Sequence, residues 1–113
     1  MYSINHILDG DDAYYIAVPL NGRVVAAVTT VNEAAIDAAT TVTLTDGTTT
    51  IGVITIASPS AEGTVDTIVF DSTSQGKVLV GPAKPIVATL AGGSSNVEIC
   101  LSILIDEFHG AAV

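Results

Sequence analysis

The stretch TVTLTDGTTTIGVITI, from Thr41 to Ile56, constrains the fold more than any other part of this 113-residue chain. Val42 and Leu44 alternate with threonines, which is the period-two pattern of a strand with one buried face. Asp46-Gly47 follows, and this dipeptide is typical of hairpin turns because both residues tolerate positive φ. The run from Thr48 to Ile56 is rich in threonine and isoleucine, which suit a pleated sheet. The sequence therefore predicts a β-hairpin and, with it, a small all-β domain.

The rest of the chain repeats this pattern of short strands separated by turn residues. Strands are expected at residues 13–20, 23–31, 64–71, 77–80, 86–90 and 97–105, with a hairpin-type turn at Asn21-Gly22 and a bend at residues 81–85. Residues 32–39 are the one place for a short helix or an ordered loop. In the last strand, one face is assigned to the core; it consists of Val97, Ile99, Leu101, Ile103 and Ile105. About eight short antiparallel strands predict an all-β, jelly-roll-like sandwich or barrel.

Residues 1–12 are expected to form an N-terminal arm in front of a single β domain at residues 13–113. Ile4, Ile7 and Leu8 form a short apolar stripe, and the acidic turn at residues 9–12 follows it. Two arrangements are open: the arm packs as an edge strand, or it reaches across to a neighbouring molecule. The segment has neither a basic nor a long apolar region, so a signal peptide is not expected.

The composition predicts self-association. Charged residues make up 13% of the chain, against about 25% in ordinary domains, whereas 49% are hydrophobic and the mean hydropathy is +0.60. A small domain leaves much of its surface exposed, so part of this apolar surface is expected to be buried between subunits. With 12 acidic and 3 basic residues the net charge is −9, which argues against nucleic acid and anionic membrane surfaces as partners. Glycine, proline and alternating threonines interrupt the apolar runs and argue against a membrane-spanning helix.

No residue pattern predicts a metal site, a cofactor or catalysis. His6, His109 and Cys100 are too few and too widely spaced for a zinc site. The acids at residues 9, 11 and 12 match only part of a calcium loop, so they are interpreted as a solvated turn. Cys100 lies in the middle of an expected strand, and no nucleophile elbow occurs, so we expect no enzyme. A small hydrolase with dispersed carboxylates remains an alternative, because the separation of carboxylates depends on the fold.

The aromatic residues are the remaining candidates for contacts. Tyr14 and Tyr15 are neighbours in an expected strand and should point to opposite faces, so one could lie in the core and the other could anchor an interface. Phe108 lies beyond the last expected strand, where it is either tucked in or in contact with a partner. Sugar-binding sites rely on ring stacking, and the chain has no tryptophan.

Taken in order, these segments resemble a known family. The order is a YYIAVP strand, TVTLTDGTTTIGVITI, AEGTVDTIVF, VGPAKPIVATLAGG and a hydrophobic final strand. In this order they resemble the small β-rich head-decoration, or capsid cement, proteins of tailed bacteriophages.

The resemblance implies a jelly-roll-like module that forms trimers on the outer surface of the virion, after synthesis in the host cytoplasm. Its partners would be copies of itself and the major capsid protein, and it would need no cofactor. The expected contact residues are Tyr2, Ile4, Ile7, Leu8, Tyr15 and Phe108. The alternative from another class is a carbohydrate- or receptor-binding sandwich of a phage fibre or a bacterial adhesion protein.

Overall fold

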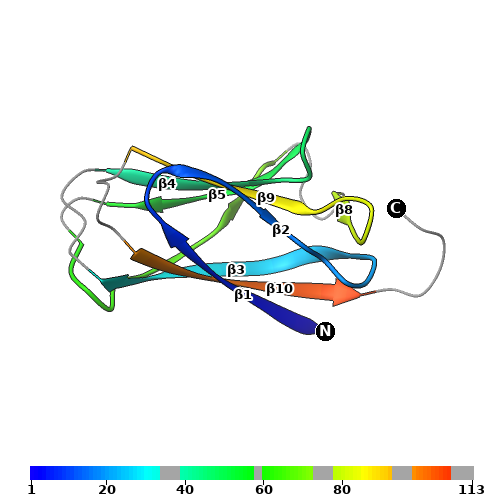
Figure 1. Cartoon of the computed structure of the whole chain (residues 1–113), viewed down its shortest axis with the longest axis horizontal. Coiled ribbons are helices and arrows are strands. Elements are labelled where there is room, and N and C mark those ends of the chain that lie inside the picture. Colours follow the sequence, from blue (N-terminus) through cyan, green and yellow to red (C-terminus); the bar gives the residue numbers. More distant parts are fainter. Residues whose placement is uncertain (34–38, 58–59, 73–77, 93–97, 108–113) are drawn as a thin grey trace.

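The computed structural model describes residues 1–33, 39–57, 60–72, 78–92 and 98–107 (Figure 1). These residues form ten strands and no helix: β1 (Tyr2–Asp9), β2 (Asp12–Ile16), β3 (Gly22–Glu33), β4 (Thr40–Thr45), β5 (Thr50–Ile56), β6 (Val65–Thr67), β7 (Val69–Phe70), β8 (Leu79–Val80), β9 (Ile86–Ala91) and β10 (Glu98–Glu107). The predicted all-β class is therefore confirmed. No helix that could cross a membrane occurs in the described residues.

The strands form two antiparallel sheets packed face to face (Figure 1). Sheet A has the order β1-β10-β3-β6, with β8 also paired to β3, and sheet B has the order β2-β9-β4-β5-β7. Along the chain, β1, β3, β6 and β10 fall in sheet A, whereas β2, β4, β5 and β9 fall in sheet B. When the two-residue strands β7 and β8 are set aside, each five-stranded sheet has four strands, and this distribution along the chain matches the double Greek key of an eight-stranded jelly roll. The predicted jelly-roll-like sandwich is thus confirmed.

The core lies between the two sheets and is built from alternate residues of each strand. β10 contributes Ile99, Leu101, Ile103 and Ile105, each at most 1% exposed, as the sequence pattern predicted. Val97 lies outside the described residues. From sheet B the largest fully buried side chains are Leu44, Ile54, Ile56, Ile86 and Leu90. Burial of one such side chain stabilises the fold by roughly 1.5–3 kcal/mol, so the core between the two sheets is the main source of stability.

The predicted hairpin from Thr41 to Ile56 is confirmed as β4 and β5. The two strands pair in antiparallel register from Thr40 opposite Ile56 to Thr45 opposite Thr50. The turn is a four-residue loop, residues 46–49, in which Gly47 has a φ of 105°. Only glycine adopts that conformation without strain.

Two predicted connections are wrong, and both corrections follow from the two-layer fold. Asn21-Gly22 is not a hairpin turn, because β2 lies in sheet B and β3 in sheet A. The single strand expected at residues 64–71 is divided into β6 in sheet A and β7 in sheet B. Buried Ile68 lies at the crossing, where its N–H donates a hydrogen bond to the carbonyl of Ala27 (2.9 Å).

The remaining predictions differ in their bounds. β3 continues to Glu33, so the helix suggested for residues 32–39 does not begin at Asn32; residues 34–38 lie outside the described part. The strand expected at residues 77–80 is β8, and Lys77 is outside the described part. Residues 2–9 are the edge strand β1, which pairs with β10 over its full length. Of the two arrangements that the sequence left open, the structure has the first: the segment packs as an edge strand.

Candidate interaction surfaces

The outer face of sheet A is a broad surface without charged side chains at its centre. Strand alternation turns Ser3, Asn5 and Ile7 of β1 outward, and the register sets them beside the outward residues of β10 and β3. Between the charged residues at the strand ends, the outward residues of the described part are Ser3, Asn5, Ile7, Ala26, Val28, Thr30, Val65, Thr67, Cys100, Ser102 and Leu104. We call this surface the A face.

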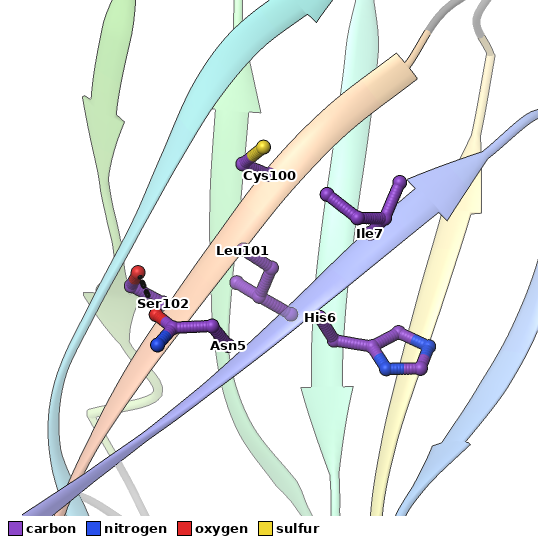
Figure 2. A pocket seen from close by; sticks show the side chains of 6 residues that line it. All are labelled: Asn5, His6, Ile7, Cys100, Leu101 and Ser102. Atoms are coloured by element: carbon purple, nitrogen blue, oxygen red, sulfur yellow. Dashed lines mark hydrogen bonds between the residues drawn. The ribbon is translucent and has the colours of Figure 1, made fainter.

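A shallow hollow of about 540 Å³ lies between β1 and β10 at this face. Figure 2 shows the side chains around it, with the Ser102 hydroxyl donating to Asn5 Oδ1 (2.5 Å). His6 extends to the other side of β1 from Asn5 (Figure 2), and its ring meets that of Tyr14 edge to face at 5.9 Å. Cys100 and His6 therefore belong to opposite faces of the sheet and do not form a nucleophile–base pair.

The outer face of sheet B is also uncharged at its centre, but it is richer in threonine. Thr41, Thr43 and Thr45 of β4 lie between outward residues of β9 and β5. Tyr15 of β2 and Val69 of β7, on opposite edges of the sheet, are each 73% exposed. We call this surface the B face; its described residues are Ala13, Tyr15, Thr41, Thr43, Thr45, Val53, Thr55, Val69, Val87, Thr89 and Ala91.

The acidic residues of the described part, together with Arg23 and Lys84, lie outside these two faces, at strand ends, in turns and on the short strand β6. Asp9 and Glu98 are cross-strand partners at one end of sheet A. At the other end, Arg23 and Asp106 form an ion pair of 3.6 Å. The result is an acidic rim around two uncharged faces. Both faces could therefore contact another protein without the burial of unpaired charge, which is costly.

The acidic turn between β1 and β2 is held by Tyr14. Its hydroxyl donates to the carbonyl of Gly10 (2.7 Å) and accepts from the N–H of Asp9 (2.9 Å). Asp12 Oδ1 accepts the N–H of Ala13 (2.8 Å). Within the described residues there is no group of three histidine, cysteine or acidic side chains placed to hold a metal ion.

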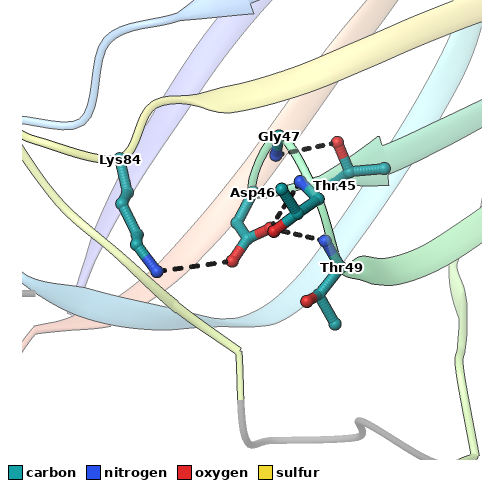
Figure 3. Close-up of polar contacts among 6 residues, drawn as sticks. Thr45, Asp46, Gly47, Thr49 and Lys84 are labelled. Atoms are coloured by element: carbon teal, nitrogen blue, oxygen red, sulfur yellow. Dashed lines mark hydrogen bonds and ion pairs between the residues drawn. The ribbon is translucent and has the colours of Figure 1, made fainter.

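In the turn after β4, one carboxyl group organises a polar site (Figure 3). Asp46 Oδ1 accepts hydrogen bonds from the N–H groups of Thr48 (2.9 Å) and Thr49 (2.7 Å) and from the Thr48 hydroxyl (3.1 Å). Its Oδ2 lies 3.8 Å from Lys84 Nζ, and the Asp46 side chain is only 7% exposed. Burial alone would raise the pKa of this carboxyl group, but the hydrogen bonds and Lys84 together lower it. The site is structural, since its acceptors are directed at its own loop.

The predicted contact residues fall in different environments. Tyr15 is exposed on the B face, and Ile7, 47% exposed, lies on the A face. Tyr2 and Ile4 are half-buried against the core, and the Tyr2 hydroxyl donates to the carbonyl of Leu20 (2.9 Å). Leu8 is fully buried, so its assignment as a contact residue is corrected to a core residue. Phe108, like His109, lies outside the described residues.

Most residues of the A face and the B face were not predicted as contact residues from the sequence. Residues 23–31 are apolar on both faces and predict a strand buried between two layers, but Val28 instead lies on the outer face of sheet A, as does Leu104, and Val69 is exposed on sheet B. The alternation that assigned one side of residues 97–105 to the core also indicated what remained on the other side. The same alternation in the other strands leaves outward positions that carry almost no charge.

Comparison of the chain with protein-family models, with curated proteins and with solved structures finds no match.

Proposed function

We propose that this chain is a capsid decoration, or cement, protein of a tailed bacteriophage, which associates with copies of itself and coats the outer surface of the assembled head. The observation that carries the proposal is the placement of charge: two uncharged sheet faces surrounded by an acidic rim. A monomer in water has no need to keep both faces of its sandwich free of charge. Such faces suit a protein that is covered on more than one side by other protein subunits.

The proposed mechanism involves binding alone and no catalysed reaction. A module that binds only the assembled shell stabilises that shell by its own binding free energy. If copies are joined to one another, as in the trimer that the resemblance implies, each contact raises the effective concentration of the next. Among the described aromatic residues, Tyr15 is the most exposed, and its amphipathic, rigid side chain suits contact with the capsid protein.

The test is co-sedimentation with heads of the encoding phage that were assembled without this chain. The wild-type protein should sediment with the heads and saturate at a fixed number of copies. Two variants place a charge on the B face, Tyr15→Glu and Val69→Glu, and should lose binding because a carboxylate would be buried at the contact. Glu62→Gln, in an exposed turn, is the matched control and should bind like the wild type.

Deletion of residues 1–12 is not a suitable variant, because it removes β1 and the buried side chain of Leu8. Absence of wild-type binding to the heads would contradict the proposal. If Tyr15→Glu and Val69→Glu both bind the heads as well as the wild type does, the B face is not the contact with the capsid. Binding to a glycan array without affinity for heads would favour a carbohydrate-binding module instead.

A further inference from the structure

β1 has a free edge of unusual length. It is the first strand in the order of sheet A and pairs with β10 on one side only, over eight residues without a register shift. The Asp9 N–H donates to the Tyr14 hydroxyl rather than to β10. Because hydrogen-bonded and non-hydrogen-bonded pairs alternate in an antiparallel ladder, the N–H and C=O groups of Ser3, Asn5 and Ile7 then point to the free edge. Within the described part of the chain, no further backbone hydrogen bond uses these groups.

This edge lacks the features by which proteins usually block edge-to-edge pairing. Such features are proline, lysine, a β-bulge or a very short strand. Residues 2–8 of β1, YSINHIL, contain no proline and no lysine, arginine or acidic residue. The core is also incompletely covered here, since Tyr2 and Ile4 pack against it but remain half-buried.

The other sheet edges among the described strands are protected by their shortness. β6 has three residues, β7 and β8 have two each, and β2 has five and is followed by Pro19. Among the described strands, β1 is therefore the only long free edge that a second copy of the chain can offer. When β1 of one copy pairs with β1 of another, both long edges are paired and the dimer is closed. If β1 paired with a different edge, one β1 edge would remain unpaired.

We propose that the free edge of β1 pairs with the β1 edge of a second copy in antiparallel orientation, which joins the two A sheets into one. Charge selects the orientation. In a parallel pair the two Asp9 carboxylates, each beside its own Glu98, would be adjacent. In the antiparallel pair centred on Asn5 they lie at opposite ends, roughly 27 Å apart (8 residues at about 3.4 Å each), well beyond the screening length of about 8 Å at physiological salt.

The register follows from the residues that face the edge. With Asn5 opposite Asn5, Ser3 of each copy lies opposite Ile7 of the other. Each of the three pairs exchanges two hydrogen bonds, or about six in total. The half-buried side chains of Tyr2, Ile4 and His6 would then be covered by the second copy. This contact concerns only copies of the chain, so it does not depend on capsid binding.

The first test is the mass of the free protein by light scattering. A two-fold contact requires an even number of copies: a dimer of 22.8 kDa (2 × 11.4 kDa), or six copies if trimers also form. Asn5→Pro removes an N–H that points to the free edge and leaves the ladder with β10 intact, so the mass should fall by half. Asn5→Ala is the matched control, because it retains the N–H, and should keep the wild-type mass. Ile7→Lys should also halve the mass, because it places a charge on the edge.

The second test reads the register by disulfide formation in a Cys100→Ser background. Asn5→Cys should form a cross-linked dimer on mild oxidation, because hydrogen-bonded partners have Cα atoms about 5.5 Å apart. Ser3→Cys should not, because its own copy would lie roughly 14 Å along the strand. A wild-type monomer or trimer, or a folded Asn5→Pro or Ile7→Lys variant that keeps the full mass, would overturn the pairing. If Asn5→Pro does not fold by circular dichroism, Ile7→Lys and the cysteine variants decide.

Discussion

At the scale of single residues, Asp46 shows how one acceptor can fix a whole turn. Its carboxylate satisfies two backbone N–H groups and a hydroxyl of the loop that joins β4 to β5, and it lies beside Lys84 (Figure 3). The Asp46 side chain is 7% exposed, whereas its donors Thr48 and Thr49 are exposed, so charge-assisted hydrogen bonds hold the loop at the protein surface. The β4–β5 register therefore depends on the ionised form of this residue.

Asp46→Ala should lower the free energy of unfolding at pH 7 by about 1 kcal/mol, because the N–H groups of Thr48 and Thr49 lose a charged acceptor at the protein surface. The pKa of Asp46 is lowered in the folded protein. Its contribution is therefore present above the unfolded pKa, near 4, and is lost as the pH falls through the lower, folded value. Urea unfolding from pH 7 down to pH 2.5 should show the gap between wild type and variant closing only below about pH 4.

Lys84→Met separates the ion pair from the hydrogen bonds. The Lys84 side chain is about half exposed, so this variant should cost no more than about 1 kcal/mol. A gap between wild type and Asp46→Ala that stays constant down to pH 2.5 would contradict the role assigned to the carboxylate.

At the scale of elements, the sequence identified strands better than the connections between them. The hairpin of β4 and β5 and the core face of β10 were predictable, because each depends on local alternation and turn residues. The division of residues 64–71 was not, since alternation continues through Ile68 and does not record a change of sheet. The Asn21-Gly22 turn was misjudged for the same reason: turn residues indicate a reversal but not whether the next strand is a neighbour or lies in the opposite layer. The two uncharged faces could not be predicted from the strands alone, because they also depend on which strands are paired.

Gly52 tests the crossing between the layers. A Cβ atom at this position would lie 2.6 Å from the carbonyl oxygen of Val69 and 2.8 Å from Ile68 Cδ1. Gly52→Ala should therefore destabilise the protein by about 1–3 kcal/mol, because β7 would have to move away from β5. Thr55→Ala, at an exposed position of the same strand, should stay within about 0.5 kcal/mol of the wild type. Thermal unfolding followed by circular dichroism would measure both, and equal stability of Gly52→Ala and the wild type would contradict this close packing.

At the scale of the whole molecule, the separation of charge from the sheet faces is the dominant feature. The chain carries a net charge of −9, yet the described acids lie at the ends and rim of a body measuring 44 × 25 × 21 Å. Copies therefore repel one another at a distance and attract one another only through uncharged surfaces in contact.

Pairing through β1 should consequently strengthen as salt is added. Raising sodium chloride from 20 to 500 mM screens the repulsion between two acidic bodies and weakens none of the proposed contacts, which are backbone hydrogen bonds and apolar side chains. Analytical ultracentrifugation should show a several-fold lower dissociation constant at the higher salt concentration. A dissociation constant that rises with salt would indicate ion pairs at the interface and contradict the proposed contact.

The pairing of β1 with β10 also has a consequence for how the molecule is made. Tyr2 lies opposite Ile105, so this ladder closes a loop of about a hundred residues, an entropically unfavourable step. During translation β1 must wait, unpaired, until β10 has left the ribosome, whereas the β4–β5 hairpin can form at once from local contacts. Sheet A is thus completed last, and β1 remains exposed and unpaired in the nascent chain for longer than the other strands.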